Sequence, residues 1–228
     1  MKLFQHPFCP HSRFVRLILA EYRVPFEFVE EDVRKRRPEF LELNPAGTTP
    51  VLLDGNFPVS TSSVIAEYID ETRGANLAEH RLLSSDPKAR AEARRIAGWF
   101  HEKFFAEVSE PLVREKILKL RLSSAEGGGP PDSSALQAAK KNIRYHIQYI
   151  GWLLKTRSWL ATEKMSFADF AAAAHLSVVD YLGDVPWDED ENAKNWYAKM
   201  KSRPSFRPLL ADLVPGMPPS KVYANLDF

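Results

Sequence analysis

The chain has 228 residues, a length that suits one or two modest domains. Apolar residues make up 44% of it and charged residues 27%, which provides enough apolar material for a packed core and excludes a disordered chain. The 31 basic and 30 acidic residues give a formal net charge of +1, which argues against a nucleic-acid partner.

Strand and helix patterns alternate along the first 80 residues. Short runs typical of strands occur at 2–4, 26–29, 51–53 and 57–59. Apolar residues at helical spacing predict helices over 14–22 and 62–72, with room for a short helix between the second and third strands. The order β-α-β-(α)-β-β-α predicts a mixed sheet with helices packed on it, an α/β domain over residues 1–80.

Strand patterns stop beyond residue 84, and residues 84–228 are expected to form an all-α domain. Helices are predicted over 87–122, 136–154 and 192–203. The stretch 123–134, SSAEGGGPPDSS, has the composition of a flexible loop. Residues 215–228 begin with a proline cluster and show no helical period, so they are predicted to be an extended tail.

A capping box is predicted at Ser166-Phe167-Ala168-Asp169. A serine followed three residues later by an acidic residue satisfies free N–H groups at a helix start. The helix it opens is rich in alanine and therefore thin. We expect this helix to form the buried centre of the helical domain.

The single cysteine, Cys9, excludes an intramolecular disulfide and favours a reducing compartment, so we expect a cytoplasmic protein. The N-terminus lacks an apolar run long enough for a signal peptide, and no window approaches the roughly 18 apolar residues of a membrane span. We therefore expect no direct membrane insertion. No metal site is predicted either, because the six histidines show no ligand spacing and no second cysteine is present.

Five segments, taken in order along nearly the whole chain, resemble the cytosolic glutathione S-transferases. They are FCPHSRFVRLILAEYRV, NPAGTTPVLLDG, STSSVIAEYID, SFADFAAAAHL and WYAKMKSRPSF. The resemblance implies a thioredoxin-like N-terminal domain followed by an all-α helical bundle, and a homodimer with a two-fold interface.

The resemblance also implies a glutathione site. Pro50 corresponds to the family's cis-proline, and the backbone of Thr49 would pair with the cysteinyl unit of glutathione. Ser62 corresponds to the serine that holds the γ-glutamyl carboxylate. Thr61 departs from the family, which usually has an acidic or amide residue there. Losing a charge-assisted hydrogen bond weakens binding by about 1.5–3 kcal/mol, so glutathione is a possible but not a required cofactor.

Cys9 matches the catalytic position of the cysteine- and serine-type transferases. It lies just before a predicted helix, where the helix dipole and free N–H groups favour a thiolate. Ser12 is the second polar residue of a Cys-x-x-Ser pattern, and its hydroxyl is expected to cap the helix or to hydrogen-bond a sulfur. A basic side chain within 34–37 could meet the glycyl carboxylate of glutathione, or could belong to a solvated helix face.

Within the family, the chain most resembles transferase-fold division proteins of alphaproteobacteria that localise to FtsZ. This resemblance implies binding to FtsZ filaments, a link to septal wall synthesis, and recruitment to the division site with little or no glutathione chemistry. The apolar tail either packs on the body or binds a partner. Its candidate partner-binding residues are Lys221, Tyr223, Leu226, Asp227 and Phe228. An active transferase that uses Cys9 is the alternative.

Overall fold

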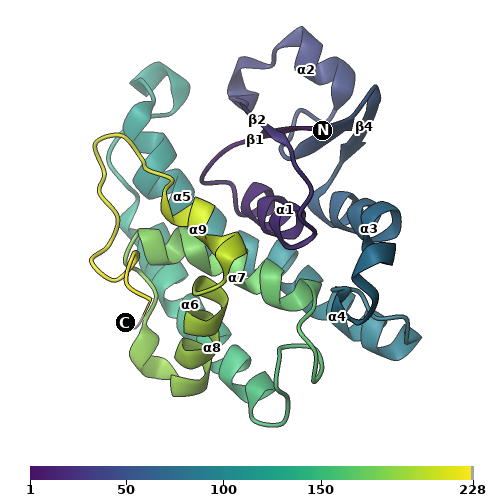
Figure 1. Ribbon diagram of the computed structural model, residues 1–228. Helices are drawn as coiled ribbons and strands as arrows, with labels where there is room; N and C mark the ends of the chain where they lie inside the picture. The colour runs from purple at the N-terminus through teal and green to yellow at the C-terminus, as the bar shows by residue number, and fades with distance from the viewer. Residues whose placement is uncertain (227–228) are drawn as a thin grey trace.

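The computed structural model describes residues 1–226, apart from the side chains of residues 76, 78 and 79. A small sheet with its helices forms one end of the molecule, and a helical bundle forms the other (Figure 1). Within the described residues, no helix has both the length and the apolar character needed to cross a membrane.

The N-terminal half confirms the predicted element order. Its strands are β1 (Lys2–Gln5), β2 (Glu27–Glu30), β3 (Val51–Asp54) and β4 (Phe57–Ser60), and its α-helices are α1 (Pro10–Glu21), α2 (Pro38–Leu43) and α3 (Ser62–Arg73). The strands lie in the order β2-β1-β3-β4. β1 pairs with β2 in parallel, and the other two pairs are antiparallel, so the sheet is mixed as expected.

The helical half begins with α4 (Pro87–Trp99), which starts at Pro87 as predicted. The chain stays helical to Arg121 through wide π-type turns on either side of α5 (Glu110–Val113). Pro111 lies in α5 and has no N–H to donate, so a regular ladder of α-helical hydrogen bonds cannot continue through it.

The predicted loop before the next helix is shorter than expected and contains a short 3₁₀ turn, Ser124–Glu126. Asp132 ends it, because its carboxylate accepts hydrogen bonds from the N–H groups of Ser134 and Ala135. As a result α6 (Ser133–Leu154) starts three residues earlier than its apolar pattern indicated. The remaining α-helices are α8 (Glu191–Lys201) and α9 (Arg207–Leu210).

Helix α7 (Phe167–Tyr181) is the centre of the bundle, and every one of its residues is buried. It packs against α4 within the bundle and against α1 of the N-terminal half, and the contact with α1 joins the two halves (Figure 1). The predicted capping box is present. The Ser166 N–H donates to Asp169 Oδ2 at 2.9 Å, while the N–H of Leu160 and the indole N–H of Trp196 both donate to Asp169 Oδ1 at 3.0 Å. Asp169 therefore fixes the start of α7, the preceding loop and α8 together.

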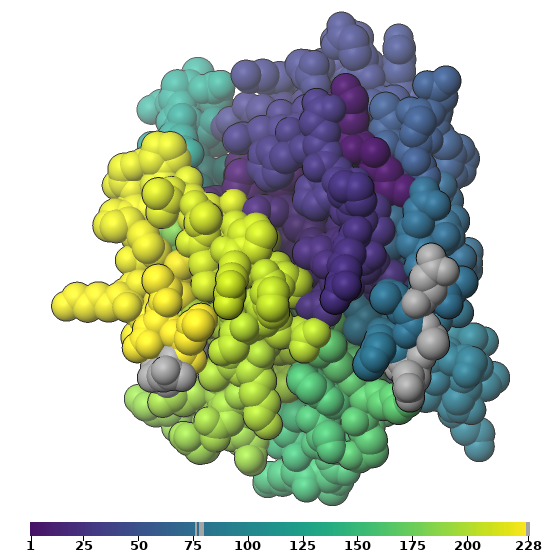
Figure 2. Space-filling model, in the orientation of Figure 1, coloured from purple at the N-terminus to yellow at the C-terminus, as the bar shows by residue number. Residues whose placement is uncertain are grey.

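The C-terminal segment turns instead of running extended. Met217 N–H donates to the Val214 carbonyl at 3.0 Å, and Tyr223 N–H donates to the Ser220 carbonyl at 3.1 Å. Residues near the C-terminus, yellow in Figure 2, lie against the purple N-terminal region. The segment turns because Val214 and Tyr223 are buried against Val178 and Tyr181 of α7. The proline cluster and the missing helical period, on which the extended tail was predicted, do not reveal this contact.

The buried carboxyl of Asp169 predicts a specific pH dependence. Burial raises its pKa to about 6, above the usual value of 3.8. Because the folded state holds this proton more tightly than the unfolded chain, the stabilisation is present below pH 3.8 and is lost as pH rises through about 6. Asp169→Asn does not titrate. We expect the unfolding free energy of the wild type, relative to this variant, to fall by up to about 3 kcal/mol between pH 4 and pH 7 in urea titrations.

Asp132→Asn is the matched control, since Asp132 caps α6 at an exposed position. Hydrogen bonds from Ser134 lower the Asp132 pKa, so its stabilising effect is lost only as pH falls. The wild type should therefore gain, not lose, stability relative to this control between pH 4 and pH 7. A wild-type advantage over Asp169→Asn that stays constant with pH would contradict the prediction.

Candidate functional site

Cys9 lies at the N-cap of α1, directly before Pro10 at the first helical position. The Thr49-Pro50 peptide bond is cis, as the resemblance implied. Cys9 Sγ lies 3.9 Å from the carbonyl oxygen of Thr49. The structure thus brings Cys9 to Thr49 and Pro50, which follow it by about 40 residues in the chain.

Ser12 does not cap the helix, so that part of the prediction is wrong. The N-cap position belongs to Cys9, which makes no side-chain capping bond. The buried hydroxyl of Ser12 instead accepts a hydrogen bond from the N–H of His6 at 3.4 Å. Ser12 therefore positions the loop that carries Cys9.

Thr61 and Ser62 lie at the start of α3. Thr61 has a φ of 73°, a left-handed value that a β-branched residue rarely adopts and that costs about 1–3 kcal/mol. Its side chain is exposed, whereas Ser62 is buried. Ser62 Oγ lies 3.3 Å from Nδ1 of His11, within hydrogen-bond distance. The hydroxyl expected to meet glutathione therefore has a partner within the chain.

His11 belongs to a cluster of three histidines that the sequence did not predict. One ring nitrogen from each of His11, His101 and His175 lies within 4.8 Å of those of the other two. His101 Nδ1 is 3.2 Å from His175 Nε2, and Ser109 Oγ is 3.1 Å from His175 Nδ1. The residues are too far apart in sequence to form a spacing motif. Their common position at the contact of α1 with the helical half is visible only in three dimensions.

The histidine cluster is electrically neutral at pH 7. Burial lowers the pKa of His11 to about 4. Burial, with a smaller contribution from His11, lowers the pKa of His101 to about 3. The pKa of His175 is also well below 6.5, first because of burial and then because of the other two histidines. Phe105 packs on the His11 ring at 4.7 Å between centroids and contributes to this apolar setting.

Two of the four basic side chains considered for the glycyl carboxylate have intramolecular partners. The Arg34 guanidinium donates to Asp32 at 2.8 Å, and Arg37 pairs with Glu31. These contacts favour the solvated, self-neutralised alternative for Arg34 and Arg37.

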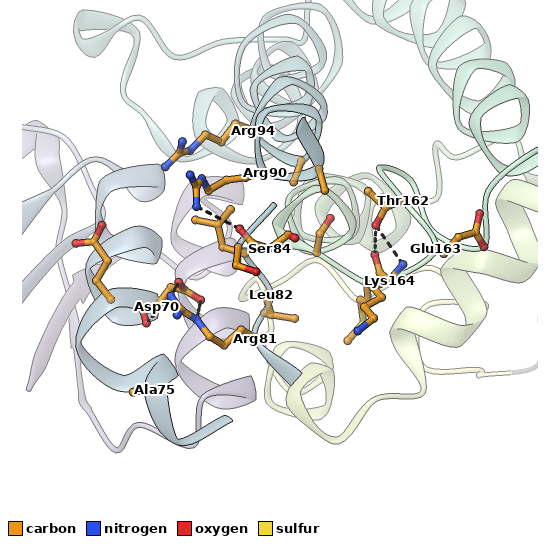
Figure 3. Close-up of a pocket in the computed structure, with 17 residues that line it drawn as sticks. Asp70, Ala75, Arg81, Leu82, Ser84, Arg90, Arg94, Thr162, Glu163 and Lys164 are labelled. Carbon is orange, nitrogen blue, oxygen red and sulfur yellow. Dashed lines mark hydrogen bonds and ion pairs between the residues drawn. The ribbon is translucent and has the colours of Figure 1, made fainter. Parts of the chain in front are cut away.

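A separate cleft of about 960 Å³ lies between α3, α4 and the loop 162–166 (Figure 3). Arg81 pairs there with Asp70, and Arg90 Nη1 donates to the Ser84 carbonyl at 3.4 Å. The residues that line the cleft include none of the predicted catalytic or glutathione-binding residues. The cleft is therefore distinct from the Cys9 site.

The candidate partner-binding tail divides into an anchor and an exposed part. Tyr223 is fully buried; its hydroxyl donates to the Leu209 carbonyl at 2.9 Å and accepts from Arg13 at 3.2 Å. Lys221 and Leu226 are exposed. Asp227 and Phe228 lie outside the described residues.

Known families match both halves of the chain. Residues 3–77 match the glutathione S-transferase N-terminal domain, and residues 108–204 match the glutathione S-transferase C-terminal domain. The chain is also 49% identical to FtsZ-localized protein A of Caulobacter vibrioides over 232 residues, which cover 99% of this chain and 97% of that protein.

Two solved structures match at full length. A glutathione S-transferase from Sinorhizobium meliloti 1021 has a TM-score of 0.96 and 50% identity, and FzlA from C. crescentus has a TM-score of 0.90 and 46% identity. Each comparison covers 100% of this chain and 99% of the other. The chain therefore belongs to the glutathione S-transferase superfamily and resembles FtsZ-localized protein A within it.

Proposed function

We propose that this chain is a transferase-fold cell-division protein that binds FtsZ filaments and links them to septal wall synthesis. The observation that carries the proposal is the 49% identity, over 99% of the chain, to a protein named for its localisation to FtsZ. The chain would act in the cytoplasm and be recruited to the division site.

The site around Cys9 supports weak or absent glutathione chemistry. Thr61 cannot supply the negative charge that would meet the α-ammonium group of glutathione. The Ser62 hydroxyl is within hydrogen-bond distance of His11, so a carboxylate would have to displace that contact. Both features weaken the γ-glutamyl end of the site.

Two exposed apolar patches support a homodimer. On the N-terminal half, the Phe57 side chain is 59% exposed and lies 5.9 Å from the Tyr68 ring. On the helical half, Trp152 is 60% exposed and stacks on Tyr149. A two-fold axis would place the first patch of one protomer on the second patch of its partner, and the second on the first.

The tail region offers a surface for a division partner. A groove of about 340 Å³, lined in part by Leu120, Leu136 and Met217, lies beside the C-terminal segment. The exposed Leu226 follows three residues after the Tyr223 anchor. The Tyr223 anchor therefore holds residues 224–226 in a defined place, which lowers the entropy cost of binding.

An active transferase is the alternative function. Cys9 at the start of α1, next to the carbonyl of Thr49 and the cis-proline, has the position that a thiol nucleophile requires. Such an enzyme would favour thiol transfer over conjugation, because its own sulfur competes as the nucleophile.

Glutathione binding and FtsZ binding, measured on one preparation, discriminate between the two functions. We expect the wild type to co-sediment with FtsZ polymers and to give no saturable heat with millimolar glutathione in calorimetry. Thr61→Glu should bind glutathione at least about tenfold more tightly, because it restores a charge-assisted contact. Saturable wild-type binding, with thiol transfer that Cys9→Ala abolishes, would establish the transferase instead.

The tail experiment must spare its anchor. Deleting residues 221–228 would remove Tyr223 and leave the buried Arg13 without one of its acceptors. We expect truncation after Ala224, or Leu226→Asp, to keep the melting temperature within about 2 °C of wild type and to lose division activity in complementation of a null strain. Leu213→Asp is the matched control, since Leu213 is 66% exposed. Normal division with the truncated chain would refute a partner role for the tail.

Phe57→Asp tests the proposed dimer. A charge at the centre of an apolar interface should weaken the dimer by about 30-fold or more and yield monomers at micromolar concentration. Light scattering measures this mass, and Leu213→Asp again serves as the exposed-leucine control. A wild type that is already monomeric at this concentration would remove the dimer from the proposal.

A further inference from the structure

We propose that His11, His101 and His175 form a binding site for a divalent transition-metal ion of the zinc class, placed between the two halves of the chain. One histidine comes from α1 in the N-terminal half, and the other two come from the π-type turns after α4 and from α7. A bound ion would therefore connect the sheet domain to the bundle.

The distances suit one ion. Nitrogens that bind the same tetrahedral zinc at about 2.0–2.1 Å lie roughly 3.3 Å apart. His101 Nδ1 and His175 Nε2 are already 3.2 Å apart. All three candidate ligand atoms lie within 4.8 Å of one another, so His11 has to move in by no more than about 1.5 Å. His11 lies in the first turn of α1 and is only partly buried, which allows this movement.

Hydroxyl groups orient the outer nitrogens of two rings. Ser109 Oγ is 3.1 Å from Nδ1 of His175, and Ser62 Oγ is 3.3 Å from Nδ1 of His11. Metal-binding histidines usually have such a partner on the second nitrogen, which sets the tautomer and the ring angle. In both residues the partner leaves Nε2 available for the ion.

The ligand set points to a particular kind of ion. Imidazole nitrogens suit zinc, copper, iron and nickel, whereas calcium and magnesium require oxygen ligands. Neutral imidazoles are metal ligands that bring no negative charge of their own. Three histidines leave a fourth tetrahedral position for a water or hydroxide.

Zinc titration of the untagged, chelator-treated full chain tests the site. We expect one ion per chain by calorimetry, a rise in melting temperature with Zn²⁺, and the visible absorption of tetrahedral Co²⁺ when cobalt replaces zinc. His11→Asn and His101→Gln should each weaken zinc binding by about 100-fold or more. Two matched controls, His80→Asn at an exposed histidine outside the cluster and Cys9→Ser, should bind zinc as the wild type does.

Circular dichroism without metal checks that each variant is folded. If one of the two cluster variants does not fold, the other still tests the site. Absence of wild-type binding at about 100 μM free zinc would overturn the proposal. So would cluster variants that bind as tightly as wild type, or binding that is lost only in Cys9→Ser.

Discussion

The buried guanidinium of Arg13 is the interaction on which the arrangement of the two halves depends. Arg13 lies on α1, has no exposed surface, and donates to the Pro7 carbonyl at 2.7 Å and to Ser177 of α7 at 2.9 Å. It also donates to Tyr223 of the tail and to Asp212. A buried cation is tolerated only where its donors have partners, and removal of one partner is costly. The N-terminal loop, the central helix and the C-terminal segment are therefore held around one charge.

Because α1 is fixed in this way, both groups at its N-terminus have defined positions. Arg16, one turn after Arg13, forms a two-pronged pair with Asp212 at 2.6 and 3.0 Å and ties the same helix to the C-terminal segment a second time. Cys9 faces the Thr49 carbonyl, and His11 faces Ser62 and the helical half. The position of Cys9 and the contact between the halves thus depend on the placement of one helix.

The sequence predicted what local patterns encode. The order of elements along the N-terminal half, the mixed sheet and the Ser166 to Asp169 capping box were correct, because periodicity and short motifs determine them. The cis-proline was implied correctly by the family resemblance. The sequence did not predict features that depend on contacts between residues far apart in the chain. An arginine within a helix is usually at the surface, so the burial of Arg13 left no signal. The histidine cluster joins residues 90 and 74 positions apart, and the tail's turns depend on a pocket for Tyr223 that only the folded bundle creates.

The burial of Tyr223 determines which residues of the tail are available to a partner. Tyr223 looked like a docking residue because aromatic side chains are rare in solvated tails, yet it packs between Tyr181 and Arg13. That burial makes it an anchor and transfers any docking role to residues that follow it. The same reasoning applies at Ser62, whose hydroxyl contacts His11. In both places a group that composition or resemblance assigned to an outside partner has a partner within the chain: Tyr223 joins the tail to α1, and Ser62 joins α3 to α1 within the N-terminal half. Phe57, Trp152 and Leu226, by contrast, keep exposed apolar surface, which the fold holds in water at a cost in solvation.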